Sequence, residues 1–361
     1  MNTKTPSGTR ADVGLWIVAI LTGATVLLQP IVGQASSLVL ILLGLIFVFW
    51  HGGRRYGAIN IIMLFVITEL VGNTMENLSI ASGFPFGHYH YTHSGTPFLF
   101  QVPITIGVAY FAYGYVAWCV ASAILEQGDE RTATIGGMII QPITAAFIMV
   151  MWDIVMDPIS STVGHQWIWE NGGGFNGVPL TNYLGWFLTV WIIFQAFAII
   201  LHLRPQTIRQ QQVTGFWVMP IIMYGTTALS YLESYLLLHT HQTVTNAVGQ
   251  TFSVTGIYQS ATTVMLFTML FATYLSLVTL LKSRTRAHRI APVIDANQEQ
   301  NDRRIASLIE LSHSRYGHCN QHNQQHERGL SPDRVDPPHF RRKPASQHIA
   351  DREQDPRTKI I

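Results

Sequence analysis

The chain has 361 residues, of which 48% are hydrophobic and only 12% are charged, and its mean hydropathy is +0.25. This composition excludes a soluble enzyme and is typical of multi-spanning membrane proteins. The formal net charge of +2 indicates no particular partner, because most of the polar residues follow residue 283.

Eight apolar runs are candidate transmembrane helices, because a hydrocarbon core of about 30 Å takes about 20 residues of helix. They cover residues 13–31, 36–50, 58–78, 102–125, 133–156, 183–202, 215–237 and 257–281, the second being short. We therefore predict an all-α fold, a polytopic integral membrane helical bundle with about eight transmembrane helices, over residues 1–282. No cleavage pattern follows the first run, so we interpret it as an anchor.

From residue 283 to 361 the sequence is polar, rich in His, Gln and Arg, and has no sustained apolar period. Such a composition cannot bury a core. We predict a mostly disordered tail, in which residues 305–311 could form a short helical turn.

Basic residues occur in alternate connections between the apolar runs. They are Lys4, Arg10, Arg54, Arg55, Arg131, Arg204, Arg209, Lys282, Arg284, Arg286 and Arg289. With eight helices these residues all fall on one side, which the positive-inside rule identifies as cytoplasmic. We predict a multi-pass protein of the cell membrane with both termini in the cytoplasm.

The other three long connections, 79–101, 157–182 and 238–256, contain no Lys or Arg and are expected outside. The first two are rich in aromatic residues, Gly and Pro. They either form an interfacial belt of aromatic residues or cap a cavity.

Two acids close the apolar run at 133–156. Asp153 and Asp157 are four residues apart and share a helix face, and Pro158 ends or kinks the helix beside them. Ionisable groups at membrane depth are rare and suggest a functional site. The pair is therefore expected at the mouth of a helix.

Three further acids complete a layer near the outward ends of the helices. Glu69 and Glu76 lie about two turns apart on one face of the third run, and Glu233 lies near the end of the seventh. Because no Lys or Arg is near them in sequence, an ion pair does not explain them. Either they make structural hydrogen bonds, or burial keeps some of them as neutral acids that donate protons.

Aromatic residues surround this acidic layer in the sequence. They are Trp152, Phe84, Phe86, Tyr89, Tyr91, Trp167, Trp169, Phe175 and Trp186. Aromatic faces can hold a long unsaturated hydrocarbon and stabilise a developing cation. Together with buried acids, they suggest proton donation to an alkene.

The histidines and cysteines do not form a recognisable metal or disulfide pattern. His88, His90 and His93 are spaced by two and three residues in a Gly- and Pro-rich loop, and no HExxH box is present. Cys119 and Cys319 make no framework. We expect no metal site. A metal-dependent lipid hydroxylase using loop histidines, with His165, His239 and His241, remains an alternative.

The ordered set of motifs over residues 60–280 resembles the membrane carotenoid hydratases. It comprises Glu76 before Gly83-Phe84-Pro85-Phe86-Gly87-His88-Tyr89 and Tyr91, then Trp152-Asp153 and Asp157-Pro158, then Trp167, Trp169, Gly177-Val178-Pro179, Asn182 and Gly185-Trp186. That family acts on γ-carotene and lycopene ψ-ends or in the bacterioruberin pathway. It adds water to the terminal C1–C2 double bond without a known organic cofactor.

The resemblance implies a lyase whose partners are an acyclic or monocyclic carotenoid, water, membrane lipid and other carotenoid-pathway enzymes, but no nucleic acid. Protonation of C2 would give a tertiary cation at C1, which water captures. We assign Asp153 or Asp157 as the proton donor and Glu76 or Glu69 as the group that positions water. The expected substrate-binding residues are Trp152, Phe86, Tyr89, Tyr91, His88, Trp167, Trp169, Asn182, Trp186 and Glu233.

A proton-coupled membrane transporter is the main alternative, because intramembrane carboxylates also carry protons along transport paths. Such a path needs access from both sides of the membrane, whereas these acids are confined to one half of it.

Overall fold

The structure is a computed structural model that describes residues 8–32, 36–92, 97–126, 129–204, 214–283 and 300–308. The chain divides into two units, Met1–Ile290 and Ala291–Ile361. In the second unit the described residues, 300–308, form a helix with exposed side chains. The rest of the tail that we predict to be disordered lies outside the described residues.

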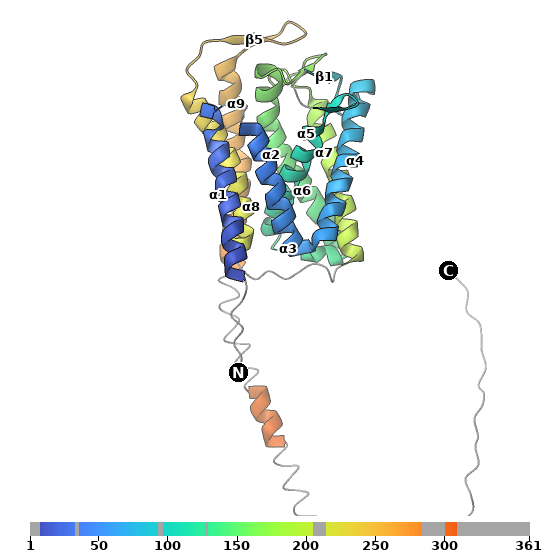
Figure 1. Cartoon of the computed structure of the whole chain (residues 1–361), viewed down its shortest axis with the longest axis vertical. Coiled ribbons are helices and arrows are strands. Elements are labelled where there is room, and N and C mark those ends of the chain that lie inside the picture. Colours follow the sequence, from blue (N-terminus) through green and yellow to red (C-terminus); the bar gives the residue numbers. More distant parts are fainter. Residues whose placement is uncertain are drawn as a thin grey trace, which may run out of the picture. The chain divides into compact units, whose positions relative to one another are not determined.

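The first unit is a bundle of long helices that run side by side (Figure 1). In chain order the helices are α1 (Gly8–Val32), α2 (Ser36–Phe47), α4 (Ala58–Ser82), α5 (Ile104–Ile124), α6 (Ile135–Asp157), α7 (Leu180–Leu203), α8 (Thr214–Leu237) and α9 (Val254–Phe267), after which 269–283 continue as helix. Within the described residues, seven helical segments are long and apolar enough to cross a membrane. The prediction of a polytopic all-α membrane protein is confirmed.

The helix that is not among these seven is α8, which covers the predicted run at 215–237. Its sequence carries Thr, Ser and Tyr side chains and one acid, Glu233, and these lower its hydropathy. Several of them, such as Thr227 and Ser230, are buried inside the bundle. The helix is therefore present where the apolar pattern predicts it, with a few polar side chains among the mostly apolar ones that it buries.

The short second run is lengthened by two turns that the hydropathy does not reveal. α2 continues through η2 (Val48–Gly52), a wider π-helical turn, and α3 (Gly53–Tyr56), so that the span reaches Tyr56. Arg54 and Arg55, which we expect in a connection, therefore belong to the last helical turn.

Arg55 is fully buried there because its charge is compensated. Its Nε donates to Asp129 Oδ2 at 2.8 Å and its Nη2 to Glu130 Oε1 at 2.8 Å. The guanidinium also lies 5.1 Å from the ring centroid of Trp217. Buried charges persist in proteins when they are paired and hydrogen-bonded in this way. We call this end of the bundle the basic end.

The middle of the bundle is α5, which packs against α4, α6 and α8. Of its span, 61% is buried, compared with 28% for the spans of α1 and α9. Small residues such as Gly107 and Gly114 on α5 allow neighbouring side chains to approach its backbone closely. Side chains on α5 therefore face the interior from several directions.

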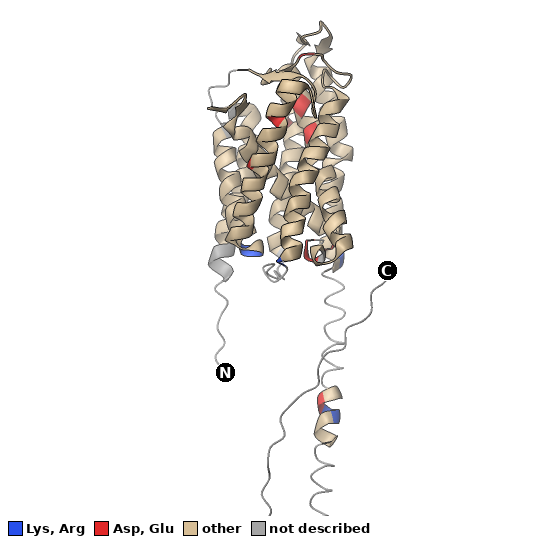
Figure 2. Cartoon of the chain, turned by 90° about the vertical axis from the view of Figure 1, so that its right-hand side faces the viewer, with Lys and Arg blue, Asp and Glu red and all other residues tan. Residues whose placement is uncertain are grey.

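Three pairs of short antiparallel strands lie in the connections that carry no Lys or Arg. β1 (Tyr89–Tyr91) pairs with β4 (Trp167–Trp169), β2 (Phe98–Leu99) with β3 (Val102–Pro103), and β5 (Thr243–Thr245) with β6 (Thr251–Ser253). β1 and β5 lie at the same end of the bundle (Figure 1). We call it the cap end. Within the bundle, the acidic positions of the long helices gather toward the cap end, whereas Lys and Arg lie at the opposite end together with Asp129 and Glu130 (Figure 2).

Candidate functional site

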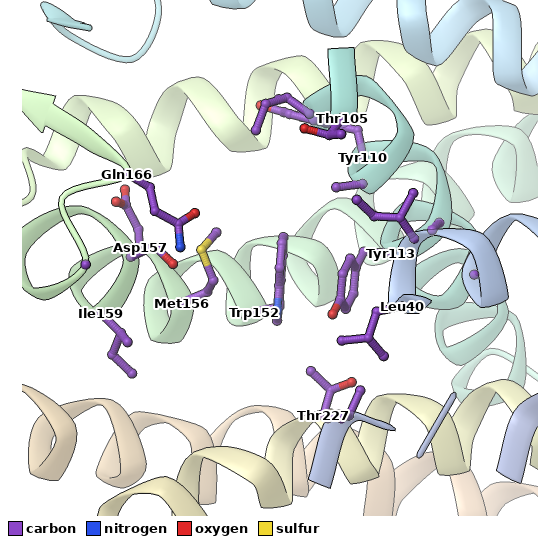
Figure 3. Close-up of a pocket in the computed structure, with 18 of the residues that line it drawn as sticks. Leu40, Thr105, Tyr110, Tyr113, Trp152, Met156, Asp157, Ile159, Gln166 and Thr227 are labelled. Carbon is purple, nitrogen blue, oxygen red and sulfur yellow. The ribbon is translucent and has the colours of Figure 1, made fainter. Parts of the chain in front are cut away.

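A cavity of about 770 Å³ lies among the helices and reaches the cap end. Its walls come from α1, α2, α4, α5, α6, α7, α8 and α9, and from the paired strands β1 and β4. Along α6, the side chains of Trp152, Met156 and Asp157 follow one another beside it, with Tyr110 and Tyr113 of α5 and Thr227 of α8 on other walls (Figure 3). Two carboxyl groups, those of Glu76 and Asp157, line this cavity.

Glu76 accepts hydrogen bonds from three phenols. Tyr89 and Tyr91 donate to Oε2, Tyr91 at 3.0 Å, and Tyr110 donates to Oε1 at 2.7 Å. Glu76 is only 4% exposed. Both of its oxygens are therefore held in place by neutral donors in an apolar surrounding.

The two tyrosines of β1 stay in their donor form. Burial, and next the nearby Glu76 carboxyl group, raise the pKa of both Tyr89 and Tyr91 well above its usual range. A phenol that remains protonated keeps its hydrogen for the bond to the carboxyl group. The two phenols are thus suited to donating hydrogen bonds to Glu76.

Asp157, the last residue of α6, is held by two indoles from β4. Trp167 Nε1 donates to Asp157 Oδ1 at 3.0 Å, and Trp169 Nε1 donates to the same oxygen at 3.4 Å. η4 (Pro158–Val163) follows directly and turns the chain toward β4. The Asp157 side chain is fully buried, but it still has polar hydrogen-bond partners.

The pairing of β1 with β4 explains how one two-stranded ribbon contacts both Glu76 and Asp157. Tyr89 lies opposite Trp169 and Tyr91 opposite Trp167 in the antiparallel register. Alternate residues of a strand point to the same face, so these four side chains share one face of the two-stranded ribbon. That face covers the acids, and the residue between the two tyrosines, His90, is exposed and contacts Glu170.

Asp153 and Asp157 are joined by one amide on α7. Asn182 Nδ2 donates to Asp153 Oδ2 at 3.1 Å and to Asp157 Oδ2 at 2.5 Å. Asp153 is fully buried, does not line the cavity, and its Oδ1 has no hydrogen-bond partner in the described part of the chain. The pair predicted from the four-residue spacing is therefore brought together by a residue from another helix.

Stacked aromatic pairs form the wall beside the acids. Tyr113 stacks on Trp152 with centroids 4.2 Å apart, and Tyr110 stacks on Trp186 at 4.2 Å. Trp152 and Trp186 meet edge to face at 6.0 Å. Such an arrangement presents π-faces that attract a cation and pack well against a polyene.

The turn before β1 is attached to α4 and α7. Ser79 Oγ donates to the Gly87 carbonyl at 2.8 Å, and Thr181 Oγ1 donates to the Phe86 carbonyl at 2.8 Å. A side chain at Gly185 would collide with Phe86 and Pro85, so glycine is required where α7 approaches the turn. This attachment gives a physical role to the Gly-Phe-Pro-Phe-Gly motif, because it places β1 over the acids.

Ten of the fourteen predicted site residues line the cavity. They are Glu76, Phe86, Tyr89, Tyr91, Trp152, Asp157, Trp167, Trp169, Asn182 and Trp186. Asp153 lies behind this lining. The other three lie elsewhere: His88 is exposed, Glu233 lies in a leucine-lined groove between α1 and α8, and Glu69 lies against Gly107 of α5.

Sequence reasoning missed Tyr110 and Tyr113, two of the three tyrosines of α5. Tyr110 is the donor to Glu76 Oε1, and Tyr113 stacks on Trp152. A signal was available, because the two phenols are three residues apart in an otherwise apolar run and therefore share a helix face. The pattern alone does not tell which helix that face meets.

Among the described residues, no group of three or more His, Cys, Asp or Glu side chains is placed so that it could hold a metal ion. His88, His90 and His165 lie in the connections at the cap end, while His93 and the tail histidines lie outside the described residues.

Residues 36–255 match the family of carotenoid biosynthesis proteins. No curated protein and no solved structure matches the chain. The match covers α2 to the start of α9 and thus includes both acids of the cavity, the β1–β4 ribbon and Asn182. The match implies a carotenoid substrate, which agrees with the substrate class implied by the resemblance to carotenoid hydratases. This membrane-embedded chain belongs to the carotenoid biosynthesis protein family.

Proposed function

We propose that the protein is a carotenoid hydratase, which adds water across the C1–C2 double bond of an acyclic ψ-end and produces a tertiary alcohol. The observation that carries the proposal is the position of Glu76 and Asp157. Both face one aromatic cavity, and each is held by neutral hydrogen-bond donors. Hydration of an alkene needs an acid that protonates carbon and a group that directs water.

In the first step Asp157 gives its proton to C2. The electrons of the C1–C2 π bond form the new C–H bond, which leaves a tertiary cation at C1. The faces of Trp152 and Trp186 are positioned to stabilise that charge. Asp153 acts through the shared amide of Asn182, which keeps the two aspartates at a fixed separation.

In the second step water attacks the cation. Its oxygen forms a bond to C1, and the resulting oxonium loses a proton to the Asp157 carboxylate, which restores the acid that the next cycle needs. Glu76 is suited to orient the water, because its three phenol contacts fix the direction of its oxygens. Reactants and products balance, with one water consumed and no proton gained or lost overall.

The test is expression in a bacterium that makes lycopene, followed by mass analysis of the extracted carotenoids. The wild-type chain should yield a carotenoid heavier by one water, with a hydroxyl at the end of the molecule. The double variant Asp153→Asn, Asp157→Asn should yield none. Glu233→Gln is the matched control, because this acid lies near the same end of the bundle but not in the cavity.

Unchanged product from the double variant would rule out the aspartates as the source of the proton. A wild-type chain that makes no hydroxylated product, but moves protons across vesicles in a carotenoid-independent way, would favour the proton-coupled transporter instead. An oxygen atom derived from O₂ and not from water would favour a hydroxylase.

A further inference from the structure

The hairpin formed by β2 and β3 presents apolar side chains that the described part of the chain leaves uncovered. Phe100 and Gln101 form the two-residue turn between the strands. Phe100 is 85% exposed, and Leu99 before it is 45% exposed. Large apolar side chains grouped on a surface indicate an apolar partner, because contact with water would be unfavourable.

The backbone of this turn is strained at Phe100. Its φ is +58°, a region in which a bulky residue is an outlier and in which two-residue hairpin turns favour Gly or Asn. Such outliers persist where the surroundings or the function require them. The turn itself would be more stable with Gly or Asn, so the reason for a phenylalanine at this position lies in its ring.

The hairpin is attached to α4 at a defined height. The backbone N–H of Gln101 donates to Asn77 Oδ1 at 3.0 Å. At the base of the hairpin, the N–H of Ile104 donates to the Pro97 carbonyl at 3.0 Å, and β3 also packs against α4. Because Asn77 directly follows Glu76 in α4, the tip of the hairpin lies at about the level of that acid.

This height coincides with the boundary of the hydrocarbon core at the cap end. α4 begins at Ala58, shortly after Arg54 and Arg55 of the basic end. About 20 residues of helix cross the core, and counted from Ala58 they end at about Asn77. The next residue, Leu78, is 41% exposed. The exposed side of α4 at Leu78 and the exposed tip of the hairpin therefore lie at the same level.

The hairpin of β5 and β6, at the same end of the bundle, has a polar character. Asn246 Nδ2 donates to Gln250 Oε1 at 2.8 Å across its turn. Gly249 supplies the positive φ that the turn needs, and Ala247 at the tip is small and exposed. β5 lies beyond the end of α9 (Figure 1). This second hairpin is suited to water and serves as the reference for the first.

We propose that the tip of the β2–β3 hairpin is a membrane anchor, in which Leu99 and Phe100 insert among lipid acyl chains at the cap-end boundary of the bilayer, level with Leu78. The partner is the apolar part of a phospholipid leaflet, and burial of the Phe100 ring in it offsets the strained turn. The aromatic connection at 79–101 then has two roles, because β1 covers the acids whereas the β2–β3 hairpin contacts lipid. The anchor does not depend on the hydratase function.

The test places a fluorophore at the tip of each hairpin. Phe100→Cys is made in the full chain together with Cys319→Ser, which leaves the buried Cys119 as the other thiol. Ala247→Cys in the same background is the matched control. Each protein is labelled with bimane and reconstituted into phosphatidylcholine nanodiscs, which expose both faces of the bilayer. Quenching is measured with a nitroxide carried on the lipid acyl chain near the headgroup, and with iodide in the water.

The label introduced through Phe100→Cys should lose most of its fluorescence to the lipid nitroxide and little to iodide, whereas the label introduced through Ala247→Cys should show the reverse. Leu99→Cys should behave like Phe100→Cys, and it decides the question if the change at Phe100 alters the turn. Equal quenching by iodide at both hairpins overturns the anchor. Protection from both quenchers overturns it as well, and a dimer in light scattering would then make the hairpin a contact between two copies of the chain.

Discussion

The two ends of the bundle bury acids in different ways. At the basic end, Asp129 is fully buried beside an equally buried cation, Arg55, and also accepts a hydrogen bond from Tyr56 at 2.8 Å. At the cap end, Glu76 and Asp157 accept hydrogen bonds from phenol, indole and amide groups, which carry no charge. The two acids there are held in place without an opposite charge.

This difference distinguishes an acid with a structural role from acids that can take part in proton transfer. An ion pair stabilises the charged form of both partners, so a proton on Asp129 would leave Arg55 with only the less buried Glu130 as its counter-charge. Neutral donors also favour the carboxylate form of an acid, but without the full opposite charge of an ion pair, and burial favours the neutral acid instead. The cap end is therefore suited to proton transfer, whereas the basic end is suited to tying α3 to the connection before α6. Substitutions that remove the acid should affect activity at one end and stability at the other.

The largest expected effect is that of Asp157→Asn on activity. The change keeps shape and most hydrogen bonds but removes the transferable proton, so product formation should fall about 10²- to 10⁴-fold, the usual contribution of a general acid. The rate is measured in membranes and normalised to folded protein. A fall of less than tenfold would mean that another group supplies the proton.

At the basic end we expect a substitution to lower the stability of the fold. Arg55→Met leaves Asp129 buried without its cation, which should cost about 3–5 kcal/mol, the range for breaking one side of a buried pair. Unfolding in detergent, followed by circular dichroism, measures this loss. Protein that remains folded should keep its turnover number; a loss of turnover without a loss of stability would contradict the division between the two ends.

A smaller effect is expected for Tyr110→Phe. The substitution removes the donor to Glu76 Oε1 while keeping the ring that stacks on Trp186. Because a hydrogen bond to a charged or reacting carboxyl group contributes about 1.5–3 kcal/mol, the rate should drop about 10- to 100-fold. Carotenoid binding, followed by absorption, should stay the same; weaker binding with an unchanged rate would make Tyr110 a substrate contact only.

The smallest effect is expected for Tyr91→Phe. Its hydroxyl shares Glu76 Oε2 with that of Tyr89, so one donor to this oxygen remains. The rate should drop only severalfold, in the range of about 0.5–1.5 kcal/mol for an ordinary hydrogen bond. Parallel assays of the two tyrosine variants make the comparison. If Tyr91→Phe is as damaging as Tyr110→Phe, the contacts to Glu76 act as one unit.

Much of the fold follows from the sequence because hydropathy and helix length are local properties. Apolar runs between basic and aromatic connections predict the helices within a few residues, and the four-residue spacing of Asp153 and Asp157 predicts their common face. The extension of α2 to Tyr56 is not predictable in this way. It depends on Asp129 and Glu130, more than 70 residues away, which compensate the charge of Arg55.

The candidate site likewise combines features that the sequence predicts with features that depend on tertiary packing. The acids and aromatic residues could be named from composition, but Glu69 and Glu233 have the same chemical type as Glu76 and do not line the cavity, nor does His88. Position in the chain does not tell which neighbour a helix face meets. That choice is made by packing, as when Gly185 lets the turn at Phe86 approach α7.

The sequence by itself therefore determined that this protein is a helical membrane protein with acids near the ends of its helices, since both properties follow from residues close together in the chain. Only the tertiary structure decided which acids share a cavity and what holds them. β1 and β4 are separated by more than 70 residues, yet their pairing delivers two phenols to Glu76 and two indoles to Asp157. Such hydrogen bonds depend on distances between segments, which no local pattern encodes.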